Sequence, residues 1–165
     1  MAGLLPLRHL GSVSRHESTR PLAFRGTFEY TLDAKNRLTV PAKFRSELAG
    51  GVVLAKGVER CVAVWTPAGY EDYTREALSG LHPASPEARQ LQRFFSANAF
   101  DTEIDGAGRV GIPPQLLEHG GLGKEVVVAG AGGWLEVWDR QAWAAYNDEL
   151  TATVSDITAN LGHPA

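Results

Sequence analysis

A short turn that mixes one acid with two cations holds the side chains best suited to chemistry in this chain. Asp33, Lys35, Asn36 and Arg37 lie within five consecutive residues. Arginine presents a rigid fork of donors that suits guanine edges and phosphates, and lysine adds a point charge. The same spacing also permits an ion pair between Asp33 and Arg37 that only holds the turn. Two interpretations therefore stand open, a cationic binding turn and a structural ion pair.

Three further cations lie close to this turn in the sequence and favour the binding interpretation. They are Arg25, Lys43 and Arg45. If the fold gathers them beside Lys35 and Arg37, they extend one positive surface, which suits the phosphate backbone of a nucleic acid. The sequence therefore makes Lys35, Arg37, Arg25 and Lys43 candidates for nucleic-acid contact.

Basic charge is concentrated in the first half of the chain, although the 165-residue protein has a formal net charge of −3. The net charge is +2 over residues 1–24, +3 over residues 25–60 and −8 over residues 61–165. This balance excludes a globally basic surface and is compatible with a local electrostatic footprint. Because solvated faces also differ in charge, the distribution alone does not decide between the two interpretations.

No constellation of catalytic or metal-binding residues accompanies the turn. Residues 101–106 alternate acids before a glycine, as a calcium loop does, but Ile112 stands where that loop needs a bidentate glutamate. Gly130 and Gly132 begin like a dinucleotide-binding loop, but Leu135 stands at the third glycine position. The five histidines are scattered, without two at ligand spacing on one element. We therefore expect no catalytic residue, metal, cofactor or small-molecule substrate, and a protein that is not an enzyme.

The single cysteine and the hydropathy pattern bear on the compartment. Cys61 cannot form a disulfide within the chain, and its apolar surroundings predict buried packing. The chain has no run of about 18 apolar residues, so we expect no membrane span and no membrane partner. Together these features predict a cytoplasmic protein.

An internal repeat is the most informative feature of the sequence. Residues 32–41 match residues 104–113 at an offset of 72, and both read apolar residue, Asp, three turn formers, Arg, apolar, any, apolar, Pro. Residues 61–65 match residues 134–138 at an offset of 73. Two anchors in the same order predict two copies of one small structural unit.

The second copy of the turn, residues 105–109, repeats the acid and the arginine of the first copy but not its lysine. It keeps Asp105 and Arg109, whereas Ala107 takes the place of Lys35. We therefore expect the second turn to bind nucleic acid more weakly, or to serve mainly in assembly.

Each copy predicts the same order of elements: strand, turn, strand, short helix, strand, strand. The alternation of apolar residues predicts strands at 27–32, 37–40, 52–54 and 62–65, and at 99–104, 110–112, 126–129 and 134–138. Helices are expected at 43–48, after 113–114, and at 67–78, 86–95 and 141–150, with a frayed tail beyond residue 151. The turn at 33–36 would then join the strands of a hairpin, whose tip can enter or border the major groove.

These elements predict an α+β protein that is mainly β. The expected divisions are a disordered extension at 1–23, a first module at 24–71, a helical linker at 72–97, a second module at 98–145, and a helix end with its tail at 146–165. Because a module of about 50 residues buries little surface alone, intertwining of the copies or self-association is expected to stabilise it.

The residues of both copies closely resemble the MraZ family. Residues 24–26 (Phe-Arg-Gly) and 32–41 resemble the start of such proteins, and residues 94–100 and 105–113 resemble their second half. The resemblance implies two tandem AbrB-like, swapped-hairpin modules in a pseudo-two-fold double-domain barrel. It also implies a homo-oligomeric ring.

The resemblance further implies a transcriptional regulator. Such a protein binds double-stranded DNA at repeated boxes ahead of the division and cell-wall gene cluster, including its own gene, and associates with the nucleoid. Lys35 and Arg37 match the motif positions to which DNA contact is attributed, and Arg109 matches the second motif. The alternative is an antitoxin-like or scaffold module of the same fold, against which the tandem repeat argues.

Overall fold

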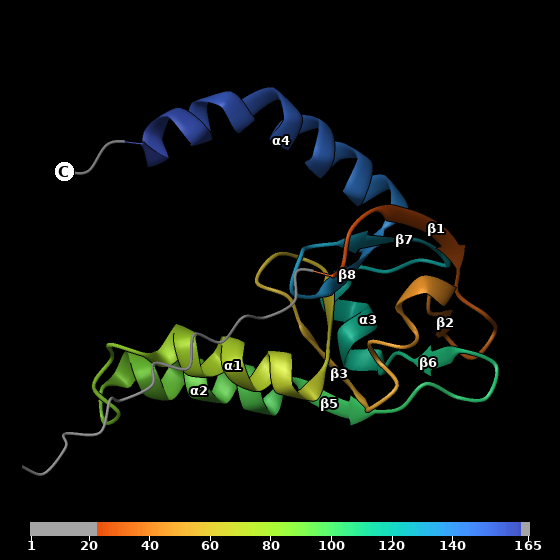
Figure 1. Ribbon diagram of the computed structural model, residues 1–165, viewed down its shortest axis with the longest axis horizontal. Helices are drawn as coiled ribbons and strands as arrows, with labels where there is room; N and C mark the ends of the chain where they lie inside the picture. Colours follow the sequence, from red (N-terminus) through yellow and green to blue (C-terminus); the bar gives the residue numbers. More distant parts are fainter. Residues whose placement is uncertain (1–22, 163–165) are drawn as a thin grey trace, which may run out of the picture.

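The computed structural model describes residues 23–162, which form two antiparallel sheets and a set of helices (Figure 1). The strands are β1 (Thr27–Thr31), β2 (Arg37–Thr39), β3 (Val52–Lys56), β4 (Val62–Trp65), β5 (Ala99–Thr102), β6 (Arg109–Gly111), β7 (Glu125–Gly130) and β8 (Leu135–Asp139). The helices are the 3-10 helix η1 (Ala42–Phe44) and the α-helices α1 (Pro67–Leu78), α2 (Pro86–Ala97), α3 (Pro114–Gly120) and α4 (Arg140–Leu161). The expected disordered extension at 1–23 lies, apart from its last residue, outside the described residues.

The two copies share one six-stranded sheet, in the order β1-β7-β8-β4-β3-β5. The first strand of each copy pairs with the third strand of the other, β1 with β7 and β5 with β3. Replacing every strand by its counterpart (β1 by β5, β3 by β7, β4 by β8) gives the same order read backwards. The sheet is open, with β1 and β5 as its edges. The expected α+β class is therefore confirmed, but the expectation that the protein is mainly β is wrong, because the helices hold more residues than the strands.

Alternation along the central strands sends side chains to two apolar clusters on opposite faces of this sheet. All four residues of β4 are buried. Val64 joins an inner cluster that includes Leu38 of β2 and Val110 of β6. Ala63 and Trp65 join an outer cluster with aromatic side chains from α1. The small β2–β6 ribbon therefore covers the inner face, and the outer face carries a layer of aromatic rings.

Helices α1 and α2 pack against each other as an arm beside the sheet (Figure 1). Both begin with a side-chain cap followed by proline: the Thr66 hydroxyl accepts from the Gly69 amide at 3.0 Å, and the Ser85 hydroxyl accepts from the Ala88 amide at 3.2 Å. The bounds expected for α1 are confirmed. Helix α2 runs to Ala97, slightly beyond its expected end.

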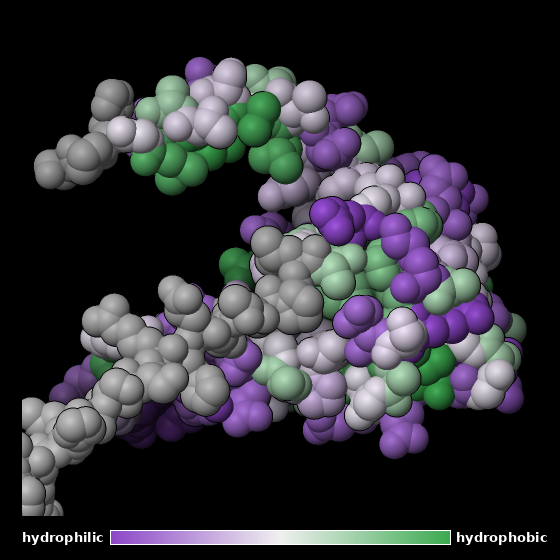
Figure 2. Space-filling view, viewed as in Figure 1, coloured by the Kyte–Doolittle hydropathy of each residue, from purple (hydrophilic) through white to green (hydrophobic). Residues whose placement is uncertain are grey.

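Helix α4 is much longer than expected, and the prediction that the chain frays beyond residue 151 is wrong. The Asp139 carboxylate caps its first turn, and the helix continues to Leu161. No proline or glycine interrupts residues 140–161, and apolar residues recur at helical spacing on one exposed side. These apolar residues are Tyr146, Leu150, Val154, Ile157 and Leu161. Figure 2 shows an apolar side of α4 turned towards the hollow between α4 and the α1–α2 arm.

The expected hairpin across residues 33–36 is also wrong. Strands β1 and β2 do not pair with each other: β1 pairs with β7 in the large sheet, and β2 pairs with β6 in a separate two-stranded sheet. Alternation within a strand identifies its buried face, not its partner, so the sequence pattern was equally compatible with both arrangements. The helix expected at 43–48 is the shorter η1 followed by turns.

Candidate nucleic-acid interface

The first turn is organised around the carboxylate of Asp33. One oxygen, Oδ1, accepts hydrogen bonds from the backbone amides of Lys35 and Arg37, both at 2.9 Å. The other, Oδ2, accepts from Arg37 Nε at 2.6 Å. The Asn36 amide donates to the Asp33 carbonyl at 2.9 Å, and Asn36 has a φ of 56°, which asparagine tolerates better than most residues. The aspartate therefore fixes both the backbone of the turn and the direction in which the arginine leaves it.

The second turn repeats this arrangement around Asp105. Its Oδ1 accepts from the amides of Ala107 and Arg109 at 2.9 Å, and its Oδ2 accepts from Arg109 Nε at 3.0 Å. Gly108 takes the place of Asn36, with a φ of 78°. The sequence repeat is thus a repeat of hydrogen bonds as well.

The β2–β6 ribbon brings the two turns together. Arg37 is opposite Gly111 and Thr39 is opposite Arg109 in the antiparallel register, so both arginines lie on the same face of the ribbon. Arg109 Nη1 lies 3.8 Å from Asp33 Oδ2, which links the turns directly. Leu38, on the other face, is buried in the core. The ribbon thus anchors one face inside the protein and displays two arginines on the other.

The hydrogen bonds of these turns favour ionised aspartates. The backbone amide of Arg37 is the main cause that lowers the pKa of Asp33, to about 2, and its guanidinium acts in the same direction. The pKa of Asp105 is lowered for the same reasons, chiefly by the amide of Arg109. Both carboxylates therefore stay charged at neutral pH and keep the arginines in place.

The ion pair with Asp33 leaves much of the Arg37 side chain available. Of the guanidinium nitrogens of Arg37, only Nε hydrogen bonds to the aspartate, and neither Nη atom hydrogen bonds within residues 23–162. The Arg37 side chain keeps 31% of its surface exposed, and Lys35 is exposed beside it. The two interpretations left open by the sequence are therefore compatible, because the structural pair uses one edge of the guanidinium and leaves the other.

Two cations that join this site were not among the predicted contacts. Lys124 Nζ donates to Asn36 Oδ1 at 2.7 Å and to the Asp33 carbonyl at 3.1 Å. Arg45 is close in sequence to the first turn, but its guanidinium lies against the second turn, where a Cβ added to Gly108 would come within 2.6 Å of it. Lys124 stands 88 residues from Asn36, so only the pairing of β1 with β7 makes this contact visible.

Arg25 and Lys43 lie elsewhere. They contact each other at the start of β1, where Lys43 Nζ donates to the Arg25 carbonyl at 3.5 Å. Lys43 Nζ also lies 5.3 Å from the ring centroid of Phe28. The first turn follows the other end of β1, about 20 Å away at the rise of an extended strand. The five predicted cations thus form two separate groups, one at each end of β1.

The fold and these turns together define a duplicated strand–turn module, in which the two copies complete a single sheet. A family described as "MraZ protein, putative antitoxin-like" matches the chain twice, at residues 23–94 and 95–161. The chain belongs to the MraZ family.

Curated relatives agree with this assignment. The chain is 43% identical over 133 residues to a protein of Paenarthrobacter aurescens (strain TC1), with 81% of this chain and 92% of the relative covered. It is 42% identical over 132 residues to one of Corynebacterium glutamicum (strain R), covering 80% and 92%. It is 35% identical over 140 residues to one of Heliobacterium modesticaldum (strain ATCC 51547 / Ice1), covering 84% and 96%. Each is named transcriptional regulator MraZ.

Within residues 23–162, none of the helices combines the length and the apolar character needed to cross a bilayer.

Proposed function

We propose that this protein is a sequence-specific DNA-binding transcriptional regulator whose first turn, residues 33–37, makes the principal contact. The observation that carries the proposal is the arrangement of the Arg37 guanidinium. Its Nε is hydrogen bonded to Asp33, whereas neither Nη atom has a hydrogen-bond partner among residues 23–162, so both can donate to a ligand. An arginine held in this way has lost part of its side-chain freedom before it binds, which lowers the entropic cost of a base contact. Lys35, exposed beside it, suits a phosphate.

The other cations would act around this contact. Arg109 shares Asp33 with Arg37, and Lys124 adds a charge at the first turn. Arg25 and Lys43, at the far end of β1, are proposed to contact phosphates further along the duplex. The net positive charge of residues 25–60 supports this footprint.

Self-association into a ring is part of the proposal. The exposed apolar side of α4 includes Val154 at 47%, Ile157 at 45% and Leu161 at 81% exposure. A stripe of this kind on a projecting helix favours contact with another protein surface, and the open edges β1 and β5 also favour pairing or cover. The reciprocal pairing of β1 with β7 and β5 with β3 supports exchange of strands between modules 24–71 and 98–145, as in a swapped-hairpin, pseudo-two-fold barrel.

A ring would display the first turn several times. We propose that it binds repeated boxes ahead of the division and cell-wall gene cluster, including its own gene, on the nucleoid in the cytoplasm. Once one subunit of a ring is bound, the contacts of the other subunits with neighbouring boxes are intramolecular. Several weak contacts together therefore give a high overall affinity.

The test is a gel shift with DNA from upstream of the protein's own gene, against a scrambled duplex of the same composition. We expect stepwise shifted bands with the upstream DNA and a smear of weaker binding with the scrambled duplex. Equal binding to both would contradict sequence specificity. Light scattering at micromolar concentration should give a multiple of the 17.8 kDa chain mass, and a single-chain mass would contradict the ring.

The description of the family as antitoxin-like favours a second candidate, a protein-binding module of the same fold. That function places the important surface on a protein partner rather than on the turns. A protein-binding module would not distinguish upstream DNA from the scrambled duplex, whereas specific binding that is lost on Arg37→Ala would favour the regulator.

A further inference from the structure

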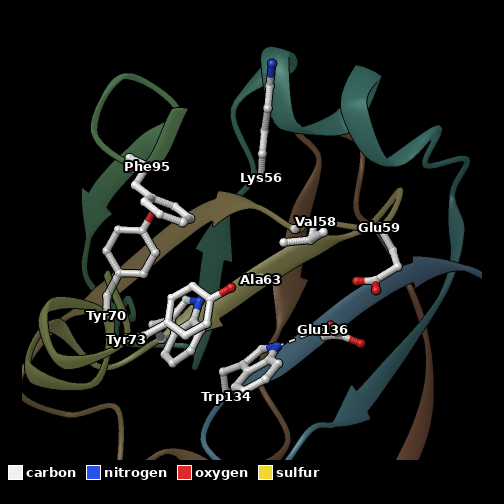
Figure 3. Close-up of a pocket in the computed structure, with 11 residues that line it drawn as sticks. Lys56, Val58, Glu59, Ala63, Tyr70, Tyr73, Phe95, Trp134 and Glu136 are labelled. Atoms are coloured by element: carbon white, nitrogen blue, oxygen red, sulfur yellow. Dashed lines mark hydrogen bonds between the residues drawn. The ribbon is translucent and has the colours of Figure 1, made fainter. Parts of the chain in front are cut away.

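A cavity of about 270 Å³ opens on the outer face of the large sheet, away from the β2–β6 ribbon (Figure 3). Aromatic residues line one side: Trp65 of β4, Tyr73 of α1, Phe95 of α2 and Trp134 before β8. The carboxylates of Glu59 and Glu136 lie on the other side. The proposed DNA contacts use none of these residues.

The aromatic side of the cavity is a fixed wall. The rings of Trp65 and Trp134 stack with centroids 4.7 Å apart and an interplanar angle of 17°. The ring centroid of Tyr73 lies 4.7 Å from that of Trp65, and the ring of Phe95 packs edge-on against Tyr73 with the centroids 5.8 Å apart. The faces of tryptophan and tyrosine rings carry negative quadrupole charge, so a wall of such rings attracts cations.

The acidic side holds two carboxylates close together. Glu136 Oε2 accepts from Trp134 Nε1 and Glu136 Oε1 accepts from Trp138 Nε1, both at 3.2 Å, which fixes its direction. One ligand atom each of Glu59, Cys61 and Glu136 lies within 4.8 Å of the others. Two carboxylates at this separation repel each other unless a positive charge joins them.

No side chain of residues 23–162 supplies that charge. Neither Glu59 nor Glu136 forms an ion pair with a described residue. Lys56 also lines the cavity, but its amine points away from both carboxylates (Figure 3). The cavity therefore combines negative charge, aromatic faces and room for a ligand.

An organic cation fits this combination better than a metal ion. Burial and the two neighbouring carboxylates raise the pKa of the Cys61 thiol, so the thiolate that a soft metal prefers is disfavoured. Only the two carboxylates then remain as charged ligands, and aromatic rings supply no further ones. A guanidinium or alkylammonium group can instead hydrogen bond to both carboxylates while its flat or methylene part lies on the rings.

We propose that this cavity binds an organic cation, with its charged group between Glu59 and Glu136 and its body against Trp134 and Tyr73. The cation can come from a free amine or from an arginine or lysine side chain of a second copy of the chain. The recognition chemistry is the same in both cases, and the two sources give different experimental results.

The experiment is isothermal titration of the full-length protein with agmatine, which carries a guanidinium and an ammonium group. Butylurea, similar in shape but uncharged, is the ligand control. Glu136→Gln and Glu59→Gln each remove one charge with little change in size, and Glu87→Gln, at an exposed position in the first turn of α2, is the matched control variant. If the cation is a free amine, we expect agmatine to bind, and each cavity variant to weaken it roughly ten- to a hundredfold, as for loss of a charged hydrogen bond. Glu87→Gln should not change the affinity.

Light scattering on the same variants identifies the other source. If the cation is a side chain of a second copy, agmatine competes poorly, and Glu136→Gln lowers the mass of the assembly whereas Glu87→Gln does not. The proposal is overturned if agmatine does not bind and the mass is unchanged, or if butylurea binds as well as agmatine. Zinc binding without amine binding would also overturn it. Thermal melting checks the fold of each variant, and the midpoint of Glu136→Gln should change little, because the repulsion that it removes offsets the indole hydrogen bond that a glutamine amide group cannot accept.

Discussion

The two turns of this protein are built alike and charged differently. In both, an aspartate accepts two backbone amides and the Nε of an arginine. The first turn exposes Lys35 and receives Lys124, whereas the second has Ala107 and is packed against Arg45. The comparison separates two roles within one motif. The aspartate and arginine hold the backbone of the turn in both copies. Lys35 and Lys124 are found only at the first turn, the copy proposed to bind DNA.

The largest difference should follow from removing the arginines one at a time. We expect Arg37→Ala to weaken binding by about 1–3 kcal/mol per turn, as for one arginine–base contact, and the effect should multiply across repeated boxes. Arg109→Ala should weaken binding several-fold less. Fluorescence anisotropy with promoter DNA measures both, with Arg75→Ala as the control because Arg75 also forms an i,i+4 ion pair on an exposed surface. If Arg37→Ala leaves the affinity unchanged and lowers the melting temperature, Arg37 only stabilises the turn and does not contact DNA.

A smaller effect is expected from exchanging the residues that distinguish the turns. Lys35→Ala should weaken binding to specific and scrambled DNA alike. The slope of log binding constant against log salt concentration should become shallower by about 0.9 for each phosphate that the protein no longer neutralises. Ala107→Lys should steepen the salt dependence, because the second turn has the same backbone as the first. The salt titrations are measured by anisotropy. A second turn that gains nothing from the lysine would show that it lies too far from the duplex.

A smaller effect, of up to about 1 kcal/mol in the free energy of unfolding, is expected from substituting the residue with positive φ in each turn, Asn36 in the first and Gly108 in the second. Asn36→Gly should cost only about 0.5 kcal/mol, since glycine adopts the same φ without strain and the hydrogen bond from Lys124 that is lost is exposed. Gly108→Asn should destabilise the protein by up to about 1 kcal/mol, because its Cβ would come within 2.6 Å of the Arg45 guanidinium, which must shift and lose its hydrogen bond to the Val40 carbonyl. Urea unfolding measures both. In an Arg45→Ala background the cost of Gly108→Asn should shrink, and a cost independent of Arg45 would show that the backbone itself is the obstacle.

The smallest expected effect is on acid stability. The pKa of Asp33 is lowered from 3.8 to about 2 in the folded protein. Its contribution to stability is therefore fully present above pH 3.8 and is lost as the pH falls towards 2. The difference in melting temperature between wild type and Asp33→Asn should shrink over that interval. A difference that is constant with pH would mean that the Asp33 charge does not stabilise the turn.

The sequence predicts the local secondary structure of this protein well, but it does not predict which strands pair with each other. The bounds of α1 and β4 follow from the chain itself, because a capping threonine with a following proline, and a short apolar run, are local signals. The Asp33–Arg37 pair was also foreseeable, since its members lie four residues apart. Burial of Cys61 follows from its apolar neighbours and is confirmed.

What the sequence does not reveal depends on which strands meet. Lys124 reaches the first turn only because β1 pairs with β7. The grouping of Arg25 with Lys43 depends on η1 packing over Phe28. The length of α4 was missed for a different reason, because the threonines and serines among residues 151–158 make this segment look polar, although Val154 and Ile157 continue the apolar side of the helix. Contacts between distant segments are set by the packing of the whole core, which no local pattern encodes.

The reciprocal strand pairing has a consequence for how the protein is made. During synthesis the ribosome releases β1 well before its partner β7, so the first copy leaves the exit tunnel without the strand that completes its edge. Most of the sheet has to form after nearly the whole chain has emerged, and such long-range pairing slows folding. An early stop codon between the copies should therefore yield an aggregation-prone polypeptide rather than a smaller working regulator.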